Sequence, residues 1–241
     1  MKQLFNTIFY NPMYNALVFL VGVLPGESVG LAVIILTILV KFILFPLAHK
    51  STTTQARMRA IEPHIKKLKE KHKNNQQEQA RATMELYKEH GVNPFSGCFL
   101  MLVQLPVIFA LYFVFFDGMK FNQDILYAFV SLPEHMNMIF LWTDLAGKSI
   151  PFALLAAITQ YFQIKLSVPM PAKAVEGVTQ SFQEEFSRSM AVQMKYVFPV
   201  LVFFIAYTIS SAVALYWIVS NVFSVCHELY VKKKAEGLMK V

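Results

Sequence analysis

A single lysine lies inside a long apolar stretch near the start of the chain. Residues 29–47 read VGLAVIILTILVKFILFPL, and Lys41 is the only charged side chain among them. About 20 apolar residues let a helix cross the hydrocarbon core of a bilayer, so this stretch is predicted to span a membrane. Measured along such a helix, Lys41 lies about 13 Å from Lys50 at its end. An isolated charge at that depth costs about 2.5–3.5 kcal/mol and indicates a functional site. The alternative is a side chain that extends to the lipid headgroups.

Other hydrogen-bonding side chains also fall within apolar stretches. Thr37 lies one turn before Lys41 on the same helix face. In the last apolar stretch, Trp217, Ser220, Asn221 and Ser224 are spaced i, i+3, i+4 and i+7, which predicts a polar stripe on one face. The candidate substrate-binding residues are Lys41, Thr37, Gln104, Gln160, Gln163, Trp217, Ser220 and Asn221. The alternative is that these polar groups only hold helices together.

The sequence offers no acidic partner for Lys41 at the same depth in the membrane. No Asp or Glu occurs inside a predicted span, and Glu228, near the end of the last one, is the closest candidate. A buried structural lysine is normally paired with an acid. We therefore expect the polar helix faces to enclose a hydrated groove that opens towards the cytosol. There the ammonium group would attract a carboxylate, by about 4 kcal/mol at 4 Å before desolvation.

The sequence offers little support for an enzyme. HExxH and P-loop motifs do not occur, and Cys98 and Cys226 are far apart and in no Cys/His cluster. We therefore expect no metal site, no cofactor and no catalytic residue. His49 and His227 lie near the ends of predicted spans, where a solvated or capping role is expected, and they alone favour an enzyme. A small solute channel or transporter remains an alternative, although no inverted repeat relates the two halves.

Composition and charge indicate an all-α, polytopic membrane protein. The chain has 241 residues, of which 56% are hydrophobic, and a net charge of +7. One domain is expected over 1–241, with five transmembrane helices, an N-terminal interfacial helix and a basic cytosolic helical hairpin. Basic residues concentrate in the hairpin, in the loop after the third span and in the tail, so the N-terminus is predicted outside and the C-terminus in the cytosol. The expected elements are the interfacial helix 4–24, the spans 29–49, 95–116, 150–166, 194–209 and 213–230, the hairpin 50–93, the extracytosolic loop 117–148, the cytosolic loop 167–193 and the tail 231–241.

Several segments, in this order, resemble the YidC/Oxa/Alb membrane protein insertases over nearly the whole chain. They are LTILVKFILFPL (36–47), LYKEHGVNPFSGC (86–98), LVQLPVIFALY (102–112), FLWTDL (140–145), YFQIKL (161–166) and ALYWIVSN (214–221). The resemblance is to a minimal bacterial member of the family. Lys41 stands where the family usually has Arg; it keeps the charge but loses the planar fork that binds a carboxylate through two hydrogen bonds.

The resemblance implies an insertase and chaperone for membrane proteins that works without ATP in the bacterial plasma membrane. It implies that the charge of Lys41 sits in a hydrophilic groove and draws in acidic translocated segments of a client. By motif, Gln104, Gln163, Trp217 and Asn221 match groove positions. The implied partners are nascent membrane proteins and the lipid bilayer, with the ribosome and a Sec translocon as candidates and no recognition of nucleic-acid sequence.

Overall fold

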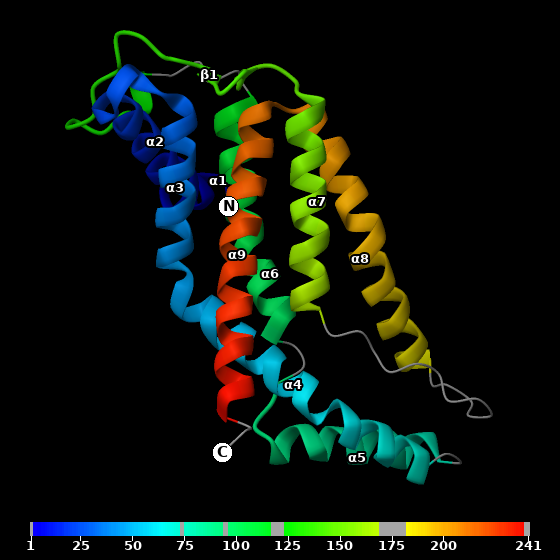
Figure 1. Cartoon of the computed structure of the whole chain (residues 1–241). Coiled ribbons are helices and arrows are strands. Elements are labelled where there is room, and N and C mark those ends of the chain that lie inside the picture. Colours follow the sequence, from blue (N-terminus) through cyan, green and yellow to red (C-terminus); the bar gives the residue numbers. More distant parts are fainter. Residues whose placement is uncertain (1, 73–74, 94–95, 117–122, 169–181, 239–241) are drawn as a thin grey trace.

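The computed structural model describes residues 2–72, 75–93, 96–116, 123–168 and 182–238. It is a helical bundle with a helical hairpin at one end and a loop region with two short strands at the other (Figure 1). The elements are α1 Lys2–Phe5, η1 Asn6–Tyr10, α2 Asn11–Val23, η2 Pro25–Glu27, α3 Val29–Ile43, α4 Phe45–Lys71, α5 Gln76–Glu89, α6 Ser96–Phe116, η3 Gln123–Ile125, β1 Ile139–Phe140, β2 Thr143–Asp144, α7 Ile150–Ser167, α8 Phe182–Thr208 and α9 Ser211–Leu238.

Helix α9 is the element around which the bundle is built. It packs against α3, α4, α6, α7 and α8. The first turns of α9 are buried from Ser211 to Trp217, and Val33, Val114 and Val202 bring α3, α6 and α8 into the same hydrophobic core. Because α9 touches every other long helix of the bundle, its side chains are the ones best placed to connect the polar residues of different helices.

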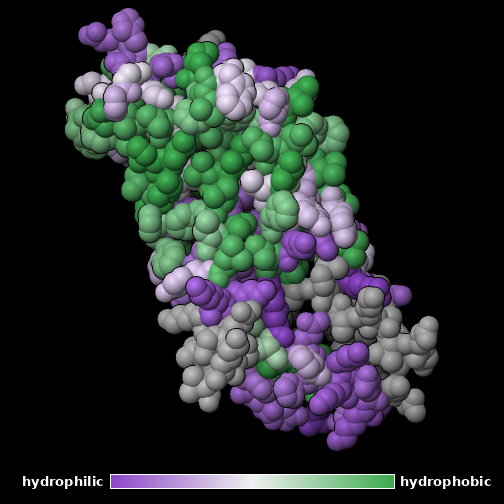
Figure 2. Space-filling model, viewed as in Figure 1, coloured by the Kyte–Doolittle hydropathy of each residue, from purple (hydrophilic) through white to green (hydrophobic). Residues whose placement is uncertain are grey.

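The outer surface of the bundle is apolar, as a lipid-facing surface must be. Large side chains such as Phe42, Ile43 and Phe204 are more than half exposed. Figure 2 shows hydrophobic residues over the bundle and hydrophilic residues at the end that carries the hairpin. Such an apolar surface is expected where a helical bundle meets lipid.

Length and composition identify two or three membrane spans among the described residues. Within the described residues, the segments Arg188–Thr208 and Ser211–Lys233 are long and apolar enough to cross a bilayer. A third span results if α3 and the first part of α4 count as one bent element, and α6 contains the shorter apolar helix Leu102–Phe115. The mainly helical membrane architecture agrees with the prediction, and the arrangement of five spans stays a prediction.

The first predicted span, 29–49, is not one straight helix. Helix α3 ends at Ile43, α4 begins at Phe45, and the two axes differ by 66°. The reason is Pro46, which has no N–H and whose ring collides with the carbonyl four residues earlier, at Phe42. Lys41 therefore lies in the last turn of α3, beside the bend, and the depth measured from Lys50 along a straight helix does not apply.

Helices α4 and α5 pack against each other as the two arms of a hairpin, whose first arm begins at Phe45 rather than at residue 50; its location in the cytosol stays a prediction. Asn75 caps α5 by accepting a hydrogen bond from the backbone N–H of Glu78 at 3.1 Å. Gly91 ends the second arm with φ of +60°. Contacts between α4 and α5 bring Tyr87 close to the carboxylate of Glu62, and burial together with this charge raises the pKa of Tyr87. Figure 1 shows the hairpin extending from the end of the bundle.

Two expectations for the second half of the chain need correction. The cytosolic loop predicted over 167–193 is helical from Phe182 onwards and continues without a break into the predicted fourth span, as α8. The tail expected from residue 231 continues α9 to Leu238. In both cases a polar helical segment extends an apolar one within a single helix.

The N-terminal helical segment packs into the bundle through one face. Leu17, Val18 and Val21 of α2 are fully buried, whereas Phe19 is 46% exposed. The exposed side chains, such as Phe19 and Val23, are apolar as well, so the burial does not test the predicted interfacial helix; α2 ends at Val23, before Pro25. Its position relative to a membrane surface stays a prediction.

Asn15 ties this helix to the loop before β1. Its Nδ2 donates to the carbonyls of Asn11 at 2.8 Å and Ile125 at 2.9 Å, and its Oδ1 accepts from the N–H of Tyr127 at 2.6 Å. Asn15 is 2% exposed. Both N–H donors and one acceptor position of this buried amide are thereby used, and two of the three bonds join segments distant in sequence.

Replacing Asn15 with Leu is expected to destabilise the protein by about 1–3 kcal/mol, because the buried Asn15 loses three hydrogen bonds, two of them to part-buried backbone groups of Ile125 and Tyr127. Thermal unfolding of the detergent-solubilised protein measures this, with Gln123→Ala as the exposed control in the same loop. An unchanged melting temperature for Asn15→Leu would show that the loop is held by other contacts.

Candidate functional site

Lys41 is directed towards α9. Its Nζ donates a hydrogen bond to Oγ of Ser224 at 3.2 Å, and that hydroxyl donates to the backbone carbonyl of Ser220 at 2.9 Å. Among the described residues, no carboxylate forms an ion pair with Lys41. The amine is thus held between two helices by a neutral hydroxyl, with its charge not cancelled by an acid.

The polar side chains of α9 near Lys41 recur every four residues. Tyr216, Ser220, Ser224 and Glu228 are each four residues apart and so lie along one strip of the helix. Gln104 on α6 donates to Oη of Tyr216 at 2.6 Å. The sequence identified Ser220, but Tyr216 was missed because a tyrosine in an apolar stretch has no distinctive signal.

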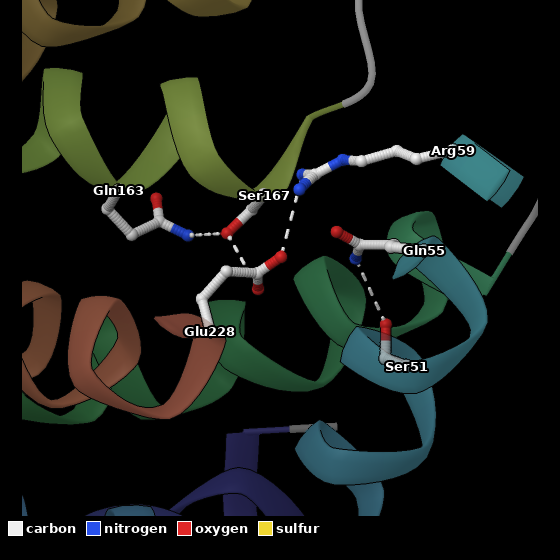
Figure 3. A network of polar contacts seen from close by, with 6 residues as sticks. All are labelled: Ser51, Gln55, Arg59, Gln163, Ser167 and Glu228. Carbon is white, nitrogen blue, oxygen red and sulfur yellow. Dashed lines mark hydrogen bonds and ion pairs between the residues drawn. The ribbon is translucent and has the colours of Figure 1, made fainter. Parts of the chain in front are cut away.

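A second polar network connects α7 and α9 to the hairpin helix α4 (Figure 3). Nε2 of Gln163 donates to Oγ of Ser167 at 3.1 Å, and Ser167 donates to Glu228 at 3.5 Å. The other carboxylate oxygen of Glu228 lies 3.5 Å from Nη2 of Arg59. Gln160 joins the chain by donating to Oε1 of Gln163 at 3.0 Å.

This network changes the role expected for Glu228. The sequence offered it as the nearest acid to Lys41, but the structure pairs it with Arg59 of α4. The reason is the bend at Leu44, which brings α4 against α6 and α9 and places Arg59 of the hairpin beside the carboxylate. Neither the bend nor this long-range pair has a periodic sequence signal, so Arg59 and Ser167 were missed.

The remaining candidate residues are buried within the bundle. Oγ1 of Thr37 donates to the carbonyl of Val33 at 2.6 Å. Nδ2 of Asn221 donates to Oγ1 of Thr159 at 3.2 Å, which connects α9 to α7. Trp217 belongs to the hydrophobic core and is 7% exposed. The structure thus brings Lys41, Gln104 and Ser220 to the α9 strip and sets Gln160 and Gln163 in the second network. Thr37 bonds within its own helix, Trp217 lies in the hydrophobic core, and Asn221 bonds to α7 instead.

His49 and His227 lie side by side at the junction of α4 and α9. Nδ1 of His49 and Nε2 of His227 are 3.0 Å apart, and the ring of Phe45 lies 4.8 Å from that of His227. The sequence predicted two separate solvated or capping residues, so their pairing corrects that expectation. No group of three or more His, Cys, Asp or Glu side chains within the described residues could hold a metal ion.

Residues 26–30, GESVG, match the pattern G-x-S-x-G of serine hydrolases. In the structure the hydroxyl of Ser28 accepts from the N–H of Leu31 at 3.4 Å and caps α3. The serine follows a turn rather than a buried strand, so the strand-to-helix elbow that the motif requires is not formed. The match is therefore explained by helix capping.

Fold and site together define an all-helical membrane protein with a cation and several hydrogen-bonding side chains between its helices. Comparison with known proteins gives the family. Residues 19–237 match the family model described as 60Kd inner membrane protein. The chain belongs to this family, that of the YidC/Oxa/Alb proteins.

Individual proteins similar to this chain agree with the family assignment. The chain is 33% identical over 227 residues to "Membrane protein insertase YidC" of Fusobacterium nucleatum, covering 93% of this chain and 97% of that protein. It is 33% identical to the protein of the same name from Pelobacter propionicus and 32% identical to that from Ectopseudomonas mendocina. These matches cover 85% and 88% of this chain, but only 35% and 32% of the two longer relatives.

Proposed function

We propose that the protein is a membrane protein insertase of the bacterial inner membrane, which moves segments of nascent membrane proteins into lipid without ATP. The observation that carries the proposal is Lys41, whose ammonium is held by the hydroxyl of Ser224 rather than by a carboxylate. Family membership supports the activity, because relatives over most of this chain are named as insertases.

The proposed step is electrostatic capture. A carboxylate in the translocated segment of a client approaches Lys41 from the cytosolic side and replaces Ser224 as its partner. At 4 Å and an effective dielectric near 20, the attraction is about 4 kcal/mol before desolvation. The hydrophilic groove that admits the client is formed by Lys41 and Gln104 together with the strip on α9. Lysine binds the carboxylate as a point charge, so clients with acidic residues at different positions are accepted.

The proposed topology has five spans, with the N-terminus outside and the hairpin and C-terminus in the cytosol. Its support is the concentration of basic residues in the hairpin, such as Lys66, Lys67 and Arg81, at the hydrophilic end seen in Figure 2. In this arrangement the bend beside Lys41 lies near the cytosolic surface. The ribosome and a Sec translocon are proposed partners that would meet the protein at this end.

Reconstitution distinguishes insertion from the alternative, a solute channel or transporter. Liposomes that contain only this protein are expected to insert a small single-span client with an acidic translocated segment, and to show no flux of ions or small solutes. Empty liposomes are the control. Solute flux without insertion would replace the proposed function by the alternative.

A variant in which His49 and His227 are both replaced by glutamine is expected to retain insertion within about twofold of the unmodified protein. Glutamine preserves a hydrogen-bonding group between α4 and α9, so the loss is limited to one bond of about 0.5–1.5 kcal/mol in stability. Insertion into liposomes at matched protein levels measures it. Abolished insertion by His49→Gln and His227→Gln in a folded protein would favour acid–base chemistry at this pair instead.

A further inference from the structure

A groove between α7 and α8 opens to the side of the bundle. Its volume is about 510 Å³, within the range of small-molecule sites. Its wall is aliphatic and aromatic and includes Ala157 and Tyr161 of α7 and Pro199 and Phe203 of α8. The groove exists because Ala157 is small and because Pro199 has no N–H for the helix bond to the carbonyl of Lys195.

Cations lie at the end of the groove nearer the hairpin. The ring of Tyr161 in the groove wall is 6.2 Å from that of Tyr196, and Nζ of Lys195 lies 5.1 Å from the centroid of Tyr196. Lys165 is exposed one turn beyond Tyr161 on α7. The nearest acidic side chain described on α8, Glu185, is ten residues from Lys195, or about 15 Å along the helix. This end therefore attracts an anion.

The length of the groove suits an acyl chain. Along α8, Lys195 and Phe204 are separated by about 14 Å, close to the depth of one leaflet, which is half of the roughly 30 Å hydrocarbon core. A client helix fits less well. A helix about 10 Å across occupies roughly 420 Å³ per turn, so the groove has room for little more than one turn. An apolar chain attached to an anionic group matches both the wall and the charged end.

We propose that the α7–α8 groove binds one anionic phospholipid, with an acyl chain between the two helices and the phosphate beside Lys165 and Lys195. The site is separate from Lys41, which faces α9. Anionic lipids attract basic residues near the membrane surface, and each lysine is expected to strengthen binding by about fivefold.

Native mass spectrometry of the full chain, with no client present, tests the site. Phosphatidylglycerol and phosphatidylcholine with identical acyl chains are added at equal concentration. One phosphatidylglycerol is expected to remain bound in preference to phosphatidylcholine. K165Q combined with K195Q is expected to weaken that preference by about 25-fold, while K148Q, at the other end of α7, leaves it unchanged. Equal retention of both lipids, or no effect of K165Q with K195Q, would overturn the proposal.

A second variant tests the apolar part. A157F places a ring in the groove and is expected to abolish retention of the lipid, whereas L155F, at an exposed position of α7 outside the groove wall, retains it. If A157F does not fold, a photo-reactive amino acid at Phe162 provides the measurement. Crosslinking to phospholipid supports the site, and crosslinking to a nascent client in place of lipid contradicts it. Neither result bears on the proposed insertase function, which is tested separately by reconstitution in liposomes.

Discussion

Reversing the charge of Lys41 is expected to have the largest effect of any single substitution. Lys41→Glu should lower insertion of a client with an acidic translocated segment by about tenfold or more, because an attraction of several kcal/mol becomes a repulsion and each 1.4 kcal/mol is tenfold. Lys41→Arg should retain activity, since the charge is kept. The measurement is insertion into liposomes, supported by rescue of cells depleted of their own insertase.

Lys41→Leu separates charge from folding in this experiment. Leucine suits the apolar α3 and leaves Ser224 bonded to the carbonyl of Ser220, so the protein is expected to fold while insertion of acidic clients falls. Normal rescue by Lys41→Glu at normal protein level would mean that the amine has no part in capture.

The second large effect is expected at the ion pair between the hairpin and the bundle. Glu228→Gln removes the negative charge opposite Arg59 and preserves the shape of the side chain. Loss of one partner from a fully buried pair costs about 3–5 kcal/mol. The Arg59 side chain is 28% exposed and so partly screened by water; we therefore expect a loss of about 1–3 kcal/mol. Hydrogen exchange should show faster opening of the part of α4 around Arg59.

A double-mutant cycle makes this expectation specific. Arg59→Gln removes the uncompensated charge, so the double variant should be more stable than the sum of the two single losses predicts. Glu70→Gln, at an exposed position of the same hairpin helix, is the control and should be neutral. Additive losses for Arg59→Gln and Glu228→Gln would show that the two side chains do not interact.

Local signals in the sequence predicted the helices well. Asn75 and Gly91 mark the ends of the hairpin arms through capping chemistry that needs only neighbouring residues. The apolar stretches 95–116 and 150–166 correspond closely to α6 and α7. Helical spacing placed Ser220 and Ser224 on one face of α9, and these two residues recur in the strip beside Lys41, whereas Trp217 lies in the hydrophobic core and Asn221 bonds to α7.

What the sequence did not predict depends on contacts between distant segments. The Arg59–Glu228 pair, the meeting of His49 with His227 and the hydrogen bond from Lys41 to Ser224 each join residues more than 160 positions apart. The bend at Leu44 was within reach of sequence reasoning, because Pro46 is visible in the stretch. The apolar residues on both sides of Pro46 favoured a single straight span, so the bend was not predicted.

A charge-swap experiment in liposomes tests the capture step most directly. Lys41→Glu is combined with a client whose translocated acidic residue is changed to lysine, and its insertion is compared with that of the original client. We predict that Lys41→Glu inserts the lysine client and fails with the acidic one, and that the unmodified protein shows the opposite preference. Equal insertion of both clients by Lys41→Glu would contradict the proposal that this cation recognises the client.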